Sequence, residues 1–337
     1  MRRLLLAASS IGVVLGVVIS PPAHAASMAL TFATFNISKV SAPAPAPGWD
    51  VRRERVVRVI AQSGADVVGL QEASWEPTPY AKTQALDVAN LLRGIGYVAP
   101  SVTKSSQQCA WTKEDPHKCI HTAALFFKSS TVAQAQTPSG DSAGFVNEGM
   151  IASGLDADSA KREVAWAYLR PVAGGATFLA ISAHTTNFRD APHEAGRVAF
   201  AAALGGWADA WNAQHGLSGA TVVLMADLNS YDMRQPAGPQ QVLRDSGWTD
   251  AAAAPTRTNE RFSTININPL TGATGWPNVP YLFKRPATRI DYIFIRGTAA
   301  PTSYEVVLYL NDDGTFNFDY QASDHQMVRA VLEFPMS

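Results

Sequence analysis

Four apolar stretches of the sequence are each followed, within three residues, by side chains that can bind a metal ion or a phosphate group. The stretches are residues 30–35, 67–70, 178–183 and 222–226. The side chains that follow them are Asn36, Glu72, His184, Asp227 and Asn229. Short apolar runs bounded by polar residues are typical of buried strands. We therefore expect four strands to bring these side chains to one edge of a sheet.

Two further polar groups occur late in the chain. Asp291 stands inside the otherwise apolar run 290–295, where a buried carboxylate is costly unless it has a partner. His325 follows Asp324 just before the last apolar run. Taken singly, such residues are ordinary turn formers or structural histidines. Together with the first group they form a pattern that is far more specific for catalysis.

The residue types in this set suit a recognisable chemistry. The carboxylates of Glu72 and Asp324 are hard oxygen ligands for a divalent cation. The amides of Asn36 and Asn229 can position a ligand. His325, paired with Asp291, suits proton transfer.

The motifs around these residues carry a resemblance to a known family. In chain order they read T-F-N, G-L-Q-E, S-A-H, A-D-L-N, R-I-D-Y-I-F and S-D-H. They resemble the motifs of the endonuclease/exonuclease/phosphatase family, a family of metal-dependent phosphoesterases that includes deoxyribonucleases and sphingomyelinases. The resemblance implies a four-layer α/β sandwich, in which two mixed β-sheets pack face to face and helices cover their outer faces.

The resemblance also implies a metal site. Glu72 resembles the principal metal carboxylate of the family, and Asn36 and Asp324 are candidates for the same metal shell. Oxygen ligands suit Mg²⁺ best here, with Mn²⁺ and Ca²⁺ as alternatives.

The catalytic residues follow from the same comparison of motifs. His325 resembles the base or electrostatic partner of the attacking water, and Asp291 would hold its tautomer. Asp227 and Asn229 resemble the pair that orients the nucleophile and contacts the phosphate. His184 resembles a histidine that donates to a non-bridging phosphoryl oxygen.

Two more residues are candidates for phosphate binding. Arg162 lies in the stretch A-K-R-E-V-A-W-A, which is similar to a family strand whose arginine reaches phosphate; an ordinary surface arginine fits equally well. His121 opens the apolar run 122–127, where deoxyribonuclease-like members carry a polar active-site residue that we expect to be glutamate. This departure weighs against the deoxyribonuclease branch.

The remaining pattern predicts an α/β protein in one domain. Amphipathic helices are expected from Val51 to about Ser63, at residues 83–93 and at residues 193–215. Additional strands are expected at residues 123–127, 164–169, 304–308 and 327–334. Strands interleaved with helices are typical of the α/β class.

The first residues predict export. Arg2 and Arg3, the apolar run 4–20 and the small residues around Ala25 resemble a cleaved signal peptide, which leaves a mature catalytic domain at 26–337. An uncleaved membrane anchor is the alternative, although the run is short for a spanning helix. No later stretch is apolar enough to span a membrane. Cys109 and Cys119 suit a disulfide that closes a surface loop of an exported protein, and a metal site is the weaker interpretation.

The charge balance bears on the substrate. A net charge of −1 provides no global positive field for nucleic acid or anionic lipid, and the cluster Arg52, Arg53, Arg55 and Arg58 suits either a local basic patch or a solvated helix face. We expect a monomeric extracellular nuclease or phosphodiesterase. A sphingomyelinase-like or inositol-phosphate phosphoesterase is the alternative, with residues 275–277 and 281–283 as membrane-touching loops. A binding module without catalysis is the third hypothesis.

Overall fold

The computed structural model describes residues 27–41, 47–102, 123–232, 238–265, 288–312 and 317–336. The predictions for the signal peptide, the cysteine pair, His121 and the two apolar loops at 275–277 and 281–283 lie outside these residues.

The first sheet has seven strands in the order β11-β13-β14-β1-β2-β4-β3. Their bounds are β1 Ser27–Asn36, β2 Val67–Gln71, β3 Tyr97–Val98, β4 Ala124–Lys128, β11 Thr256–Thr258, β13 Ala300–Val306 and β14 Val328–Pro335. Strand β1 runs parallel to β2, with Asn36 opposite Gln71, and antiparallel to β14. Residues Asn36 and Glu72 therefore come to the same edge of this sheet.

The second sheet contains six strands in the order β10-β12-β9-β8-β7-β5, and a seventh, β6, pairs with β7. Their bounds are β5 Val132–Gln134, β6 Ala143–Asn147, β7 Glu163–Pro171, β8 Phe178–His184, β9 Val222–Asp227, β10 Thr249–Asp250 and β12 Asp291–Arg296. Asp227 lies opposite His184 on the parallel strand β8 and opposite Asp291 on the antiparallel strand β12. The register of three strands thus places these polar residues side by side.

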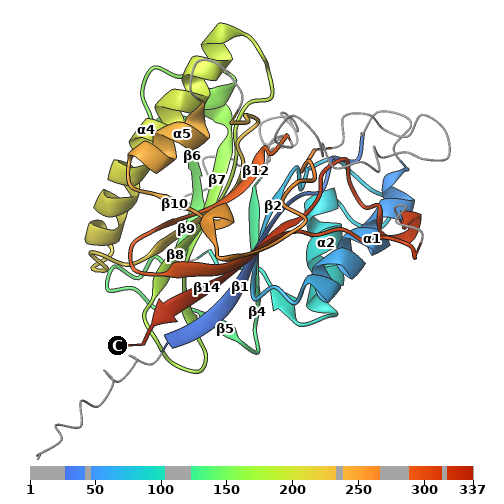
Figure 1. Cartoon of the computed structure of the whole chain (residues 1–337), viewed down its shortest axis with the longest axis horizontal. Coiled ribbons are helices and arrows are strands. Elements are labelled where there is room, and N and C mark those ends of the chain that lie inside the picture. The colour runs from blue at the N-terminus through green and yellow to red at the C-terminus, as the bar shows by residue number, and fades with distance from the viewer. Residues whose placement is uncertain are drawn as a thin grey trace, which may run out of the picture.

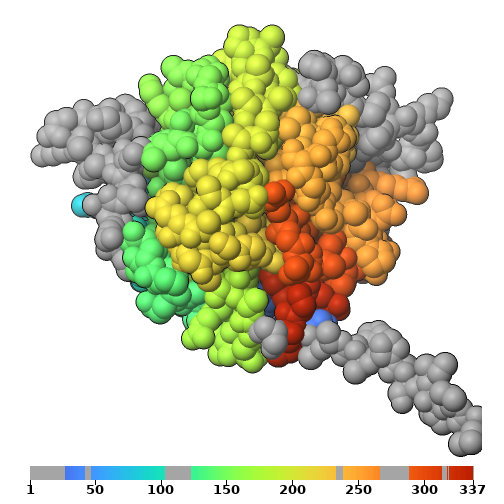
Figure 2. Space-filling view, turned by 90° about the vertical axis from the view of Figure 1, so that its left-hand side faces the viewer, coloured from blue at the N-terminus to red at the C-terminus, as the bar shows by residue number. Residues whose placement is uncertain are grey.

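The two sheets pack face to face, and helices cover their outer faces (Figure 1). The interface between the sheets is apolar, and the rings of Phe32 and Phe178 meet edge to face at 5.5 Å. Helices α1 (Trp49–Ser63) and α2 (Gln84–Arg93) cover the first sheet. Helices α4 (Ala191–Gln214) and α5 (Pro239–Asp245) cover the second, where they lie beside each other on the face seen in Figure 2. The predicted four-layer α/β sandwich is confirmed.

Local signals explain the helix boundaries. Thr83 caps α2 by accepting a hydrogen bond from the Leu86 amide, and Asp190 caps α4 in the same way through the His193 amide. Helix α1 ends at Gly64, which takes the left-handed conformation that glycine tolerates. The elements that the sequence pattern missed are short, including α3 (Glu148–Ile151) and the 3₁₀ turns Ser159–Lys161, Ala251–Ala253 and Phe318–Tyr320. Strand β13 also begins and ends before the predicted 304–308.

A polar bridge inside the apolar interface joins the two sheets directly beneath the edge that carries the polar residues. The Gln71 amide donates to the Ser182 hydroxyl at 3.1 Å, and that hydroxyl donates to the Leu70 carbonyl at 3.0 Å. Gly69 allows the close approach, because a Cβ atom there would lie 2.7 Å from the Cβ of Met225. Buried polar groups of this kind need partners with fixed geometry, so the bridge sets the relative position of β2 and β8.

Among the described residues, no helix combines the length and apolarity needed to cross a bilayer.

Candidate active site

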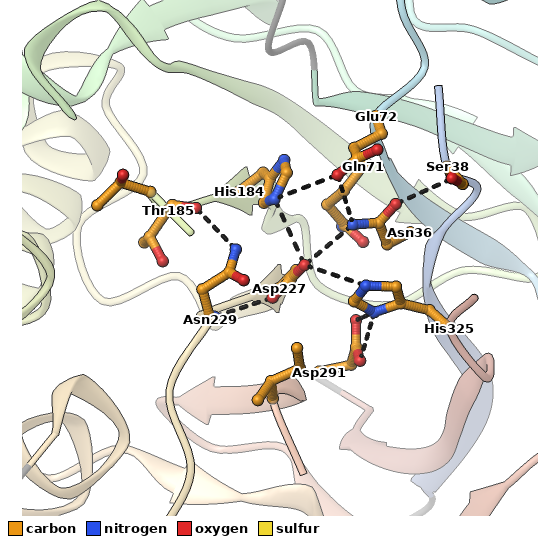
Figure 3. A network of polar contacts seen from close by, with 12 residues as sticks. Asn36, Ser38, Gln71, Glu72, His184, Thr185, Asp227, Asn229, Asp291 and His325 are labelled. Atoms are coloured by element: carbon orange, nitrogen blue, oxygen red, sulfur yellow. Dashed lines mark hydrogen bonds and ion pairs between the residues drawn. The ribbon is translucent and has the colours of Figure 1, made fainter. Parts of the chain in front are cut away.

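Asp227 is the centre of a polar cluster at the edge shared by both sheets (Figure 3). Its Oδ2 accepts a hydrogen bond from the Asn36 amide at 3.0 Å. The same oxygen lies 3.4 Å from Nε2 of His184 and 3.8 Å from Nε2 of His325. Its Oδ1 accepts from the main-chain amide of Asn229 at 2.8 Å. Residues from separate parts of the sequence thus meet at one carboxylate.

His325 is held by Asp291, as the sequence predicts for a proton-transfer pair. Nδ1 of His325 lies 3.0 and 3.1 Å from the two Asp291 oxygens, and both residues are buried. This contact directs Nε2 toward Asp227 and the cavity. Burial by itself lowers the pKa of His325, but the carboxylates of Asp291, Asp227 and Asp324 outweigh it and raise that pKa well above its ordinary value.

Replacing Asp291 with asparagine is expected to shift the pH dependence of activity. A base must be neutral to accept a proton, so kcat/KM should rise with pH through the raised pKa of His325. The uncharged amide of the Asp291→Asn protein cannot stabilise the imidazolium, so the pKa of His325 should fall, because burial lowers it and only Asp227 and Asp324 still raise it. The acid limb of the kcat/KM profile should move to lower pH. The plateau should fall by no more than the loss of the base itself, which is about 10²-fold to 10⁴-fold. An acid limb that stays in place would show that His325 does not titrate in catalysis.

Glu72 is joined to Asp227 through the Asn36 amide, which contacts both carboxylates (Figure 3). One carboxylate oxygen is 3.3 Å from the Asn36 amide and 3.9 Å from Nε2 of His184. The other accepts from the main-chain amide of Lys39 at 3.1 Å. About a quarter of the side chain is exposed, so it can reach a ligand.

A cavity of about 350 Å³ opens beside the cluster. The residues that line it are Glu72, Asn187, Arg189, Asp227, Asn229, Tyr231, Ile265, Thr288, Ile290, Asp324 and His325. Three of these are carboxylates outside the His325–Asp291 pair. Such a cavity is large enough for a small ligand, and its lining is rich in carboxylates.

The donor set fits a hard divalent cation. Glu72, Asp227 and Asp324 present carboxylate oxygens to one cavity, and Asp227, Asp291 and His325 bring ligand atoms within 4.8 Å of one another. Burial and the neighbouring Asp291 raise the pKa of Asp227 to about 7. A bound cation would relieve this concentration of negative charge.

Asn36 lies beside Glu72 and Asp227, and its predicted place in the metal shell stays a prediction. Its side-chain oxygen accepts from the Ser38 amide at 3.0 Å, and its nitrogen faces Asp227 and Glu72. An amide nitrogen is a donor and no metal ligand, so this arrangement lets Asn36 hold the two carboxylates in place. A second acidic group with a histidine, Asp156, Asp158 and His193, lies outside the cavity lining.

The backbone at this edge adopts a conformation that most side chains avoid. Ser38, Glu72 and Asn229 have φ values of 56°, 56° and 47°, which is the left-handed region. Asparagine tolerates this region, whereas serine and glutamate are strained in it. Strain of this kind is retained where the position of a side chain or a turn matters. It therefore indicates that this edge of the sheets has a function.

Arg162 does not contact the cavity, in contrast to the predicted phosphate clamp. Its guanidinium is 1% exposed and donates to the main-chain oxygens of His184 and Thr185 at 3.3 and 3.0 Å. It also pairs with Asp158 at 3.2 Å. The side chain therefore supports the end of β8 from inside the fold. Its burial and its occupied donors contradict the predicted contact with phosphate.

The arginines of α1 all make contacts within the fold, and Arg58 among them is exposed. Arg52 is buried, and its guanidinium donates to five main-chain oxygens. These are the oxygens of Pro47, Ile37, Ser38, Lys39 and Ala322. Arg53 pairs with Asp87, and Arg55 and Arg58 donate to the carbonyls of Gln321 and Asp319.

The remaining predicted residues take different places. Asp324 is exposed and lines the cavity, whereas His184 is buried beside Asp227 and Glu72. The Asn229 amide donates to the Thr185 carbonyl at 2.9 Å, and its main chain adjoins Asp227. The roles assigned to these residues stay predictions. The sequence analysis missed Arg189 and Tyr231 at the cavity, because single polar or aromatic residues in loops give no pattern.

Comparisons with known proteins agree with this fold and site. The family model described as Endonuclease/Exonuclease/phosphatase family matches residues 33–325. No curated protein matches the sequence. The described fold and the carboxylate–histidine cluster are those of a metal-dependent phosphoesterase. The chain belongs to the endonuclease/exonuclease/phosphatase family.

Solved structures share the fold at low sequence identity. A family protein from Bacteroides thetaiotaomicron is 16% identical with a TM-score of 0.64, over 92% of this chain and 96% of that one. A mannosyl-6-phosphatase from the same organism is 17% identical with a TM-score of 0.62, over 90% and 99%. D. rerio TDP2, complexed with single strand DNA product, is 14% identical with a TM-score of 0.53, over 90% and 98%.

Proposed function

We propose that this phosphoesterase is an exported phosphodiesterase that cleaves nucleic acid with the help of a divalent cation, Mg²⁺ in the first place. The observation that carries the proposal is the His325–Asp291 pair, whose Nε2 points toward Asp227 at the carboxylate-lined cavity. A paired histidine beside a cation site is suited to activating water against a phosphorus centre.

The chain's own residues divide the reaction between them. His325 takes the proton of the attacking water at Nε2, and Asp291 holds the Nδ1 proton and stabilises the imidazolium that forms. Asp227 orients the water, with its two oxygens fixed by Asn36 and Asn229. His184 and Asn229 donate to the phosphoryl oxygens.

The carboxylates of Glu72 and Asp324 would hold the divalent cation, with Asn36 holding Glu72 in place. When bound, the cation supplies charge neutralisation for the phosphoryl and leaving oxygens. Mn²⁺ and Ca²⁺ have the same ligand preference and are tested beside Mg²⁺.

Nucleic acid is proposed as the substrate for two reasons. A protein of the same fold, D. rerio TDP2, is complexed with a single strand DNA product. The cavity also has an arginine and a tyrosine at its border, which suits a ligand with both phosphate and aromatic rings. The alternatives are a phospholipid head group, an inositol phosphate and a sugar phosphate, the last because of the mannosyl-6-phosphatase fold.

Export is proposed from residues 1–25, whose composition is typical of a signal peptide. Expression of the full-length chain in a bacterial host should release a protein whose N-terminus begins near Ala26. N-terminal sequencing of the protein in the medium tests this. An intact Met1 on a membrane-bound protein would support the anchor alternative.

Hydrolysis by the purified mature protein tests the proposed activity. The substrates are supercoiled DNA, single-stranded DNA, RNA, bis-p-nitrophenyl phosphate, sphingomyelin, an inositol phosphate and mannose 6-phosphate, each with Mg²⁺ and with chelator. Cleavage of nucleic acid that depends on Mg²⁺ is the expected result. Hydrolysis of a lipid or of a monoester without cleavage of nucleic acid would replace the proposed substrate.

A further inference from the structure

Two loops border the cavity and contribute lining residues that have no role in the proposed reaction. The first loop, residues 185–190, follows β8 and contributes Asn187 and Arg189. The second, residues 228–232, follows β9 and contributes Asn229 and Tyr231. The proposed reaction uses Asn229 and leaves the other three residues without a role.

Buried arginines fix the main chain of the first loop. Arg162 donates to the Thr185 carbonyl at 3.0 Å, and Arg197 donates to the carbonyls of Thr186 and Phe188 at 2.6 and 2.8 Å. Both guanidinium groups are 1% exposed. Burying a charged group is costly unless its donors are satisfied. Because the loop carbonyls satisfy the donors of both arginines, these contacts stabilise one conformation of the loop.

The second loop is tied to the first through the same buried group. Glu194 pairs with Arg197, and the Ser230 hydroxyl donates to the other oxygen of Glu194 at 3.2 Å. The Tyr292 hydroxyl donates to the Arg289 carbonyl at 2.7 Å and also lies 3.2 Å from the Ser230 carbonyl. Asn229 adds a direct bond between the loops, from its side chain to the Thr185 carbonyl at 2.9 Å. The two loops therefore form one preorganised border of the cavity.

Side chains on this border are exposed and fit a ligand. Arg189 is exposed, and within the described part of the chain it forms no hydrogen bond or ion pair. It is also the one arginine or lysine among the described residues that line the cavity. Tyr231, on the second loop, is 37% exposed. A free guanidinium suits phosphate and an exposed ring suits a nucleobase.

We infer that the two loops form a subsite for one unpaired nucleotide next to the cleaved bond, with its phosphate on Arg189 and its base on Tyr231. This inference rests on the proposed function and narrows its substrate to single-stranded nucleic acid or unpaired ends. A duplex is disfavoured, because the net charge is −1, Arg52 is buried and Arg53 is paired with Asp87. A base must be unstacked before a tyrosine can stack on it.

Binding measurements on the mature protein, residues 26–337, test the subsite. The protein carries His325→Gln so that the nucleic acid probes are not cleaved. The probes are fluorescent single-stranded DNA, single-stranded RNA and duplex DNA with Mg²⁺. Adding Tyr231→Ala should weaken binding of a single strand by about 5-fold to 100-fold, the range for loss of one stacked base. Adding Arg189→Gln should lower the slope of log K against log salt by about 0.7, the value for one lost phosphate contact.

Arg170→Gln is the matched control, because it removes one exposed arginine at the far end of β7 from His184. It should match the parent protein in affinity and salt slope. A preference for duplex, or an Arg189→Gln protein with the salt slope of the Arg170→Gln protein, would overturn the inference. The single strand that binds more strongly, DNA or RNA, identifies the nucleic acid whose nucleotide the subsite binds.

Kinetics of the otherwise wild-type protein separate this inference from the proposed function. Arg189→Gln should raise KM for a single-stranded oligonucleotide more than for bis-p-nitrophenyl phosphate, which has no neighbouring phosphate. Equal losses on both substrates would place Arg189 at the reacting phosphate and contradict the subsite. If the wild-type protein cleaves no nucleic acid, the proposed function fails and the inference fails with it; if it does and Arg189→Gln has no effect, only the inference fails.

Discussion

Replacing His325 with glutamine is expected to lower kcat by about 10²-fold to 10⁴-fold, the usual contribution of a positioned general base. The imidazole is held at Nδ1 by the Asp291 carboxylate, and its Nε2 is directed at Asp227. Glutamine fills a similar volume but cannot take the proton. Steady-state rates with bis-p-nitrophenyl phosphate, which needs no substrate recognition beyond the reacting phosphate, measure the effect.

His215→Gln is the contrasting control. His215 is also buried, but it packs against Trp166, Tyr168 and Trp211 at the end of α4, away from the cavity. Its replacement should lower Tm and leave kcat per folded molecule unchanged. His325→Gln should show the opposite pattern. Unchanged turnover in His325→Gln would exclude the proposed mechanism.

Replacing Glu72 with glutamine is expected to raise the Mg²⁺ concentration that gives half-maximal activity. The increase should exceed the roughly 10-fold to 100-fold loss of metal affinity that is typical when a residue hydrogen-bonded to a metal ligand is replaced. Glu72 offers a partly exposed carboxylate to the cavity, and its strained backbone indicates that its position matters. Glutamine keeps the shape but removes the negative charge. Titration of activity with Mg²⁺ after treatment with chelator measures the change.

Glu333→Gln removes an exposed carboxylate from the far end of β14 and serves as the matched control. Its Mg²⁺ requirement should equal that of the wild-type protein. Recovery of the full wild-type rate by Glu72→Gln at high Mg²⁺ would show a role limited to metal affinity. A Glu72→Gln protein with an unchanged Mg²⁺ requirement would contradict the assignment of this residue to the cation.

The helix and strand pattern was predictable because the elements that matter most are long or buried. Helices α2 and α4 carry capping residues in the sequence, and the buried strands β2, β8 and β9 read as uninterrupted apolar runs. Short strands such as β5 and β10 contain too few residues to show a period. They form because neighbouring long strands offer hydrogen-bonding edges.

The cluster could be predicted because its residues end buried strands, and strand register then brings them together. His184, Asp227 and Asp291 are direct partners across three strands. The contacts of Arg162 and Asn36 could not be predicted in this way. Arg162 lies between the 3₁₀ turn Ser159–Lys161 and β7, and whether it reaches a ligand or a carbonyl depends on the chain that folds around it. The orientation of the Asn36 amide likewise depends on its neighbours.

The border of the cavity was the least predictable part. Arg189 and Tyr231 lie in loops without periodic patterns, and they become informative only when the buried Arg197 and Glu194 are seen to fix both loops. Similarly, the α1 arginines look like a solvated or nucleic-acid-binding face in the sequence. Each of them contacts carbonyl or carboxylate groups that only the folded chain brings near.

Locating Mn²⁺ by anomalous diffraction in crystals of the mature protein tests the central claim most directly. The account predicts a peak in the cavity, within ligand distance of Glu72 and Asp324 and beside Asp227. The same crystals of Glu72→Gln should show a weaker peak or none. A peak confined to Asp156, Asp158 and His193, with an empty cavity in an active enzyme, would contradict the account.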